Sequence, residues 1–155
     1  MSFGLAIAIF GAALAVALPG IGSAYGVRVG GQASAGVVAE NPDMFGKLLV
    51  IQALPGTQGI YGFLTGVIVM IQLGMLGGTP AELTVSQGLQ YFGACMPIAI
   101  GGLFSAIYQG NTAVAAIHMT AKQPDSSAKG ITMTAIVETY AILALLVSLL
   151  LLFSI

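Results

Sequence analysis

Charged side chains are few in this 155-residue chain, and their positions constrain its fold more than any other feature. The ionisable residues are four Lys or Arg, five Asp or Glu and one His. All but Arg28, His118 and Glu138 fall at residues 40–47, residue 82 or residues 122–129. The hydrophobic intervals between these places are each long enough to cross about 30 Å of hydrocarbon, which takes about 20 residues. Since 57% of the residues are hydrophobic and only 6% are charged, a soluble domain is excluded and an integral membrane protein is predicted.

The pattern predicts an all-α membrane protein with four transmembrane helices. We expect them at about residues 3–39, 44–76, 84–121 and 129–155, and the first three are long enough to tilt or to project beyond the bilayer. Turn-forming segments lie between them, at residues 41–43, 77–80 and 123–127. Because these connections are short, consecutive helices should be antiparallel neighbours. The chain then consists of a helical hairpin at 1–76, an outer loop at 77–83 and a second hairpin at 84–155.

The basic residues predict the orientation in the membrane. All four lie in or near the first and third connections. By the positive-inside rule, the connections near residues 40–47 and 122–129 face the cytoplasm and both termini face outward. Cleavage of the first segment as a secretory signal is the alternative, but that segment lacks the basic region that such signals carry.

The two halves of the chain resemble each other at a spacing of 82 residues. The matching positions are Ser23-Ala24, Ala33, Ala39 and Pro42-Asp43 in the first half, and Ser105-Ala106, Ala115, Ala121 and Pro124-Asp125 in the second. Chance identity between helices rich in Ala and Gly is the alternative. The coincident Pro-Asp turns and the matching topology favour duplication of one antiparallel hairpin.

Small residues follow one face of the first and of the third predicted helix. The rows are Gly22, Gly26, Gly30 and Ser34, and Gly102, Ala106 and Gly110. Such rows allow helix backbones to approach closely in lipid. Because one row would suffice within a monomer, the two rows favour an inner helix layer in a symmetric assembly, and packing within the monomer is the alternative.

Glu138 lies well inside the last hydrophobic segment. A charge at the centre of a bilayer costs roughly 2.5–3.5 kcal/mol, so an acid there is normally neutralised, paired or bound to a cation. We therefore interpret Glu138 as an ion-carrying carboxylate. At the 82-residue spacing, or with a gap of two, its counterpart in the second helix falls at Gly56 to Gln58, so only the second hairpin keeps the acid.

Neutral oxygens accompany the acid. Leu54, Thr57, Gln58 and Tyr61 are spaced i, i+3, i+4 and i+7, which places them on one face of the second helix. Gln109 lies in the third helix at a depth comparable to that of Glu138. Hard cations prefer such oxygen ligands. For Thr57 or Gln109 alone, a hydrogen bond to a neighbouring helix is the alternative. Tyr61 could also serve for packing or anchoring, but its better-motivated role is donation of a hydrogen bond to Glu138.

The remaining distinctive residues are assigned structural roles. Pro19-Gly20 and Pro55-Gly56 are expected to bend the first two helices. Cys95 cannot form an internal disulfide and is expected to pack between helices. His118, near the cytoplasmic end of the third helix, is expected to be interfacial rather than catalytic.

Three segments carry a resemblance to a known family. They are residues 54–62 (LPGTQGIYG), residues 108–110 (YQG) and residues 137–143 (VETYAIL). Together they resemble the signature segments of the duplicated proteolipids of V-type rotary ATPases, and the resemblance covers essentially the whole chain. The chain is most similar to the membrane-ring subunit K of the bacterial sodium-translocating members.

The resemblance implies a homo-oligomeric ring of four-helix protomers, with the first and third helices inside. The ring would turn against a stator membrane subunit of the a/I type, and central-stalk subunits would meet its cytoplasmic loops. ATP hydrolysis would occur in other subunits, because this chain has no nucleotide motif and no catalytic residue is expected in it. The bacterial plasma membrane is the implied location, with surrounding lipid and without nucleic acid as a partner.

The resemblance also implies a Na⁺ site. Its ligands would be the backbone carbonyl of Leu54, the hydroxyl of Thr57, the amide oxygens of Gln58 and Gln109 and the carboxylate of Glu138. Tyr61 would close the site with a hydrogen bond to that carboxylate. H⁺ remains the alternative ion, because the same carboxylate can carry a proton.

Two other classes of protein compete with this interpretation. A small multidrug exporter also has four helices and one membrane acid, but its acid is expected in the first helix of a shorter, unduplicated chain. A pore-forming proteolipid without coupling to ATP is disfavoured by the converging oxygens.

Overall fold

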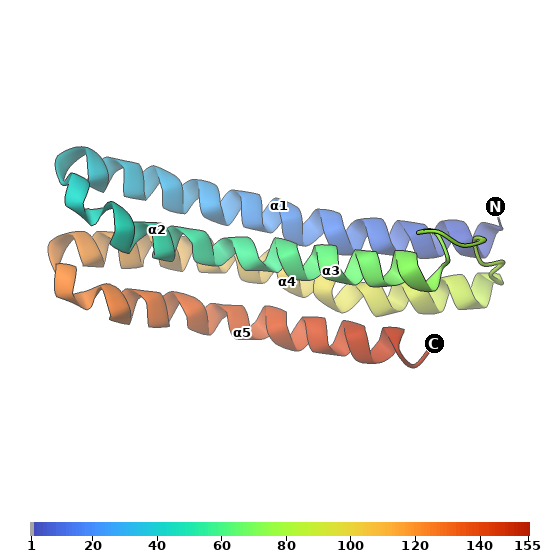
Figure 1. Cartoon of the computed structure of the whole chain (residues 1–155). Helices are drawn as coiled ribbons and strands as arrows, with labels where there is room; N and C mark the ends of the chain where they lie inside the picture. Colours follow the sequence, from blue (N-terminus) through green and yellow to red (C-terminus); the bar gives the residue numbers. More distant parts are fainter. Residues whose placement is uncertain (1) are drawn as a thin grey trace.

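Four long helical rods run side by side in this computed structural model, which describes residues 2–155 (Figure 1). The first hairpin holds α1 (Phe3–Glu40), the 3₁₀ turn η1 (Pro42–Met44) and a second rod made of α2 (Phe45–Ala53), η2 (Leu54–Gly56) and α3 (Thr57–Gln72). The second hairpin holds α4 (Val85–Lys122), η3 (Pro124–Ser126) and α5 (Ser127–Leu152). Both termini lie at the end of the bundle that holds the α3–α4 loop, opposite η1 and η3 (Figure 1).

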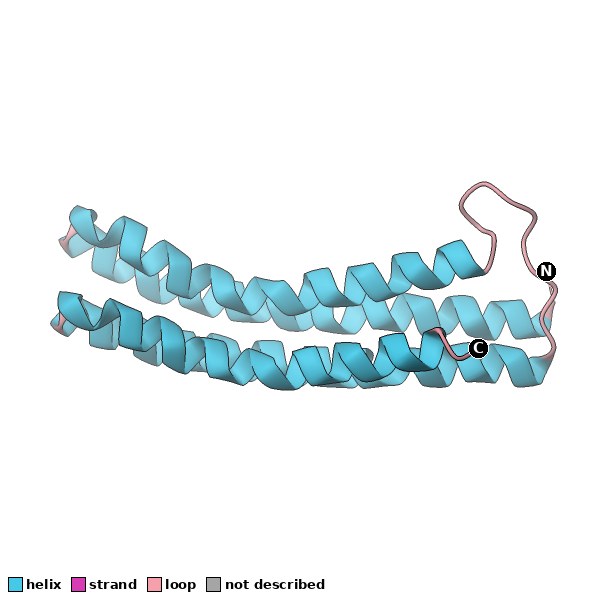
Figure 2. Cartoon of the chain, turned by 60° about the horizontal axis from the view of Figure 1, so that its bottom comes forward, coloured by secondary structure: helices cyan, strands magenta, loops and turns pink. Residues whose placement is uncertain are grey.

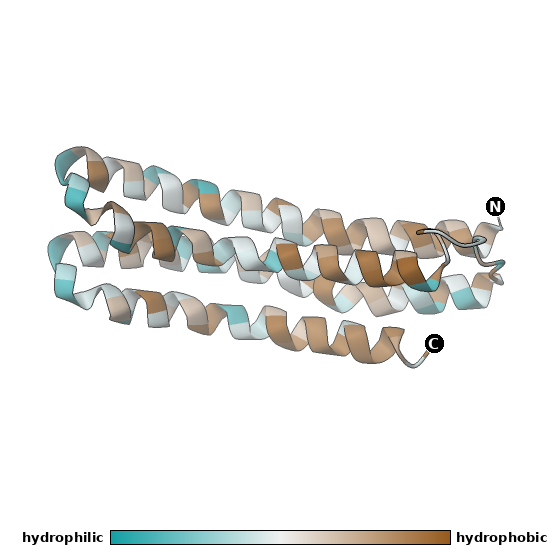
Figure 3. Cartoon of the chain, in the orientation of Figure 1, coloured by the Kyte–Doolittle hydropathy of each residue, from teal (hydrophilic) through white to brown (hydrophobic). Residues whose placement is uncertain are grey.

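Each rod is long and apolar enough to cross a membrane, with lengths of 29 to 38 residues. The predicted class, an all-α protein with four membrane-spanning helices in two antiparallel hairpins, is confirmed. Figure 3 shows the most apolar residues in the halves of α3 and α5 nearest the α3–α4 loop. More hydrophilic positions lie towards the Pro-Asp turns (Figure 3). All four rods bow gently along their length (Figure 2).

Two helices, α3 and α5, have ends that differ from the sequence prediction by more than one residue. α3 ends at Gln72 rather than at residue 76, because Gly74 has a φ of 68° and terminates the helix. The N–H of Met75 donates to the Met70 carbonyl and that of Gly74 to the Ile71 carbonyl, which is a Schellman termination. α5 covers Ser127–Leu152 instead of 129–155.

The start of α4 is specified locally. The side chain of Thr84 accepts the N–H of Gln87 at 3.3 Å, and the side chain of Gln87 accepts the N–H of Thr84 at 2.9 Å. This reciprocal capping box satisfies two backbone donors at the helix N-terminus, where no preceding turn of helix offers a carbonyl.

The prolines act differently in the two rods of the first hairpin. α1 continues through Pro19 without a break in its helical assignment. Pro55 lies in η2, where the second rod changes to a 3₁₀ turn for three residues. Pro55 thus coincides with a change of helix type directly before α3, whereas Pro19 is buried in a continuous helix and packs against α3 and α4 at Gly62 and Gly102. The predicted bends at both prolines stay predictions.

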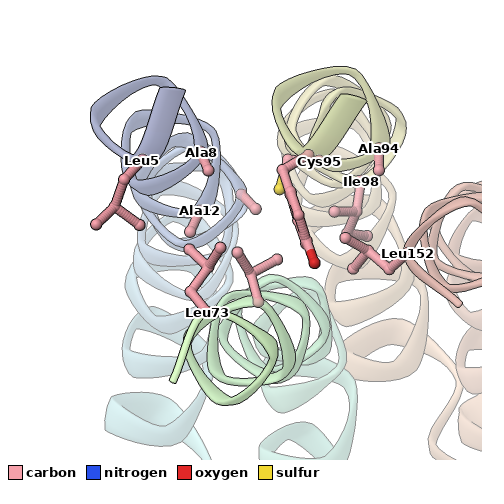
Figure 4. Close-up of a cluster of buried hydrophobic side chains, with 11 residues drawn as sticks. Leu5, Ala8, Ala12, Leu73, Ala94, Cys95, Ile98 and Leu152 are labelled. Carbon is pink, nitrogen blue, oxygen red and sulfur yellow. The ribbon is translucent and has the colours of Figure 1, made fainter. Parts of the chain in front are cut away.

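An apolar cluster fills the bundle near the termini. Residues of α1, α3, α4 and α5 converge there (Figure 4). The labelled members are Leu5, Ala8, Ala12, Leu73, Ala94, Cys95, Ile98 and Leu152. Cys95 is fully buried in this cluster, in agreement with the packing role predicted for it.

Gly22 and Gly26 of the first row of small residues pack against Ala106 and Gly110 of the second row, whereas Gly30 faces Gln52 and Gly102 faces Pro19. An added Cβ at Gly22 would lie 3.0 Å from that of Ala106, and one at Gly26 would lie 2.7 Å from the Ala106 carbonyl oxygen. Gly110 meets the backbone of Gly26 directly. Part of both rows is therefore used within one chain, as the alternative interpretation expects, and the inner helix layer of a symmetric assembly stays a prediction. Side chains at these positions would prevent the close approach of the two helices.

Candidate ion-binding site

Glu138 and Tyr61 form the carboxylate side of the site. Glu138 lies in α5 and is partly buried. The hydroxyl of Tyr61, one turn into α3, donates a hydrogen bond to Glu138 Oε1. The Thr65 hydroxyl donates to the Tyr61 carbonyl at 3.0 Å, within the same helix. The acid of the second hairpin is thus held by the first hairpin.

Two fully buried glutamines connect α3 and α4. Nε2 of Gln58 donates to Oε1 of Gln109 at 2.5 Å and to Oγ of Ser105 at 3.2 Å. Nε2 of Gln109 in turn donates to the carbonyl of Thr134 on α5, at 3.0 Å. Because buried amides must be hydrogen-bonded, these contacts determine how the glutamine oxygens are presented.

The η2 turn brings the remaining oxygens to the same place. The Thr57 hydroxyl donates to the Leu54 carbonyl at 3.0 Å and approaches Gln58 Oε1 at 3.4 Å. Thr57 and Tyr61 are one helical turn apart on α3, so Tyr61, which holds the carboxylate, lies on the same face of α3 as this group of oxygens. The structure therefore brings together the predicted site residues in two connected sets, Leu54–Thr57–Gln58–Gln109 and Tyr61–Glu138.

Only one charged side chain is part of this constellation. Among residues 2–155, no three His, Cys, Asp or Glu side chains lie close enough to hold a metal ion by themselves. The other oxygens belong to a carbonyl, a hydroxyl and two amides. A single carboxylate among neutral oxygens matches a cation of one charge, since the filled site is then electrically neutral.

Ser105 and Thr134 support the glutamines, and the sequence analysis did not identify this role. Ser105 accepts the Gln58 amide and donates to the Val137 carbonyl at 3.1 Å, directly before Glu138. Its counterpart Ser23 accepts the N–H of Gly59 at 2.8 Å. The Ser23–Ser105 repeat was visible in the sequence, and in both halves this serine joins the first helix of a hairpin to a neighbouring helix.

The chain matches a known family twice. The sequence profile that describes the C subunit of ATP synthase matches residues 10–69 and again residues 92–151. The two matches begin 82 residues apart, the spacing of the repeat seen in the sequence. The chain belongs to the ATP synthase C-subunit family. Because the profile matches both halves, the predicted duplication of one hairpin is confirmed.

The chain is similar to subunits of V-type and A-type complexes. It is 45% identical to the V-type sodium ATPase subunit K of Enterococcus hirae, over 96% of this chain and 91% of that protein. It is 39% identical to the A-type ATP synthase subunit K of Methanocaldococcus jannaschii, over 92% of this chain and 60% of that protein. It is 28% identical to the 16 kDa proteolipid of the V-type proton ATPase of Nephrops norvegicus, over 75% of this chain and 70% of that protein.

The family has a known general role. Its members are the membrane-embedded, non-catalytic proteolipids that form the oligomeric ring of an ATPase complex. The four membrane-spanning rods and the buried polar cluster between them suit this role.

Proposed function

We propose that this chain is a rotor-ring protomer of a V-type ATPase and that it carries Na⁺ across the membrane on Glu138. The observation that carries the proposal is the Tyr61–Glu138 hydrogen bond, which leads from α5 to the helix that also carries Thr57 and the fully buried Gln58. The proposed ligands are the Leu54 carbonyl, the Thr57 hydroxyl, the amide oxygens of Gln58 and Gln109 and the Glu138 carboxylate.

The number and charge of these oxygens favour Na⁺ over H⁺. A proton carrier needs only the carboxylate, whereas five oxygens can replace most of the hydration shell of a small cation. The name of the Enterococcus hirae relative, a sodium ATPase subunit, supports the same choice. In the structure Gln109 Oε1 accepts the Gln58 amide, and its second lone pair, together with the Gln58 amide oxygen beside Thr57, remains for a cation.

The proposed transport cycle follows from the cost of charge in lipid. Where the site faces hydrocarbon, Glu138 must be bound to a cation or protonated. At the interface with a stator membrane subunit, a cationic residue of that subunit would stabilise the free carboxylate and release the ion. The membrane potential contributes about 2.3 kcal/mol per charge per 100 mV. ATP hydrolysis belongs to other subunits of the complex in this proposal.

We also propose a partner and a membrane side for the η1 and η3 turns at one end of the bundle. Lys47 on α2 donates to the Pro124 carbonyl at 3.2 Å, so the two turns form one joined surface. We assign this end to the cytoplasm and to contact with central-stalk subunits, and both termini to the outer face of a bacterial plasma membrane. Three basic residues at these turns, Lys47, Lys122 and Lys129, support the orientation.

Protection of Glu138 by Na⁺ tests the proposal. A hydrophobic carbodiimide adds to the protonated carboxyl group, and bound Na⁺ keeps that group deprotonated and enclosed. At constant pH, millimolar Na⁺ is expected to slow modification of Glu138 in the purified ring by tenfold or more, and K⁺ is not. The reaction is followed by mass spectrometry of the intact protomer. A rate that follows pH alone and ignores Na⁺ would instead identify a proton ring.

Removal of the Ser105 hydroxyl is expected to weaken Na⁺ binding without removing a ligand. Ser105→Ala leaves the Gln58 amide and the Val137 carbonyl each without one partner, at a cost of about 1–3 kcal/mol. The Na⁺ concentration that gives half-maximal protection should rise roughly five- to hundredfold. Ser86→Ala, at an exposed position in the first turn of α4, is the control and should leave this concentration unchanged. Equal protection in both variants would show that Ser105 does not orient the site.

A further inference from the structure

The α1–α4 layer has exposed residues that repeat those of its own internal contact. Within the chain, an added Cβ at Gly11 would lie 2.8 Å from the Cα of Phe92. At the 82-residue spacing, the counterpart of Gly11 is Gly93 and that of Phe92 is Phe10. Gly93 has no atom within 4 Å of its Cβ position, and Phe10 is 58% exposed. Gly93 therefore has no neighbour at its Cβ position in the described protomer, and Phe10 keeps a large exposed face although its ring stacks on Phe92.

The same correspondence holds further along the helices. Gly22 packs against the backbone of Leu103 inside the chain. Their counterparts, Phe104 and Ile21, are 48% and 60% exposed. If the α4 face of one copy receives the α1 face of the next, Phe104 and Ile21 lie opposite each other and bury their exposed side chains, at a wider helix separation than glycine allows inside the chain. A second copy of this chain is therefore the partner that fits, in a head-to-tail contact that repeats around a ring.

The closest approach inside the chain identifies a specific pair at this interface. Gly26 and Gly110 meet backbone to backbone. Their counterparts are Tyr108 on α4 and Arg28 on α1, and both are exposed in the protomer. We propose that, in the assembled ring, the guanidinium of Arg28 of one protomer packs on the aromatic ring of Tyr108 of the next protomer.

The position of Arg28 in the bundle explains why it needs this partner. Along the helices, Arg28 lies ~18 Å from the C-terminal end of α1, and Glu138 lies ~17 Å from the N-terminal end of α5. Both ends adjoin the Pro-Asp turns, so the two side chains are at the same depth in the bundle. A cation exposed to hydrocarbon at this level would be costly. Its guanidinium already lies 5.4 Å from the centroid of the Tyr25 ring. A second aromatic face, Tyr108 of the next copy, would enclose it from the other side, and Phe104 stacks on that ring at 6.1 Å.

Four cysteine positions test the predicted contact in the full complex with Cys95 replaced by Ala. The pairs R28C/Y108C and F10C/G93C should give a ladder of cross-linked dimers, trimers and larger species with a short bismaleimide. The exchanged pairs R28C/G93C and F10C/Y108C use the same positions but are separated by roughly 20 Å or more along the helices, and they should give no ladder. The pair Y25C/N111C, joined by a 3.5 Å hydrogen bond within the chain, should cross-link inside the monomer.

Tyr108 substitutions test the chemistry of the contact. Tyr108→Phe keeps the aromatic face and should retain the dissociation rate of the ring, whereas Tyr108→Leu should dissociate roughly fivefold faster. Arg28→Ala should have the effect of Tyr108→Leu, and the double substitution should add little to either. Equal dissociation of Phe and Leu variants would overturn the cation–π contact.

This inference rests on the ring of the proposed function, and the outcomes separate the two. An intact ring in which R28C/Y108C gives no ladder would overturn the inference and leave the proposed function standing. Absence of any ring, judged by the size of the purified complex, would overturn both. A ladder in a ring that Na⁺ fails to protect from carbodiimide would support the interface and reject only the choice of ion.

Discussion

Replacement of Glu138 by Gln is expected to abolish ion transport by the complex. Gln keeps the shape of the side chain and can still accept the hydrogen bond of the Tyr61 hydroxyl, so the ring should assemble. The site then has no negative charge, and it can neither bind Na⁺ as a neutral pair nor carry a proton. ATP-driven ²²Na⁺ uptake into vesicles that contain the purified complex should fall to the level without ATP.

Glu82→Gln is the matched control for this experiment. Glu82 is an exposed acid in the loop between the hairpins, so its removal changes the net charge of the chain equally but leaves the site intact. Uptake by this variant should remain at the wild-type rate. Uptake by an assembled Glu138→Gln ring above background would show that the transported ion does not travel on Glu138.

Addition of one methyl group at Gly110 is expected to disrupt the packing of α1 against α4. A Cβ at this position would overlap the backbone of Gly26, which cannot move aside as a flexible side chain could. Overpacking of this kind costs about 1–3 kcal/mol and sometimes more. In a ring the cost recurs in every protomer. Gly110→Ala should therefore reduce the yield of assembled ring severely, as measured by size-exclusion chromatography of detergent-solubilised membranes.

Gly46→Ala separates this effect from a general effect of alanine. Gly46 lies on α2, is exposed and has no atom within 4 Å of its Cβ position. Since Ala has a higher helix propensity than Gly, ring yield should stay at or above that of the wild type. A normal yield for Gly110→Ala would mean that α1 and α4 are not in close contact at this level.

The site draws on both copies of the duplicated hairpin. α3 of the first hairpin contributes Thr57, Gln58 and Tyr61, while Gln109 and Glu138 come from α4 and α5. At the 82-residue spacing, the counterparts of Gln109 and Glu138 are Val27 and Gly56, which cannot bind a cation through their side chains. Each protomer therefore has one such constellation for its two hairpins. A ring of these protomers would have half as many carboxylates as a ring of equal size in which every hairpin carried an acid.

Much of this protein could be predicted from its sequence. The uncharged intervals predict four membrane-spanning helices, because the cost of charge in hydrocarbon is large and local to each residue. The 82-residue repeat predicts two equivalent hairpins, and an acid in an apolar helix draws attention to Glu138 without any knowledge of its neighbours. These properties depend on single residues or on short segments.

Only the tertiary structure decided how the helices face one another. The rows at Gly22–Ser34 and Gly102–Gly110 both predict close contact, but which surface each row meets depends on helix rotations that periodicity does not specify. The structure turns Gly22 and Gly26 towards Ala106 and Gly110, and it leaves Arg28 and Tyr108 outward. Likewise, Ser105 gains its role only because Gln58, 47 residues away, is brought to it by packing. Hydrophobicity determines whether a helix enters the membrane, whereas shape and hydrogen bonding between helices determine what each of its faces contacts there.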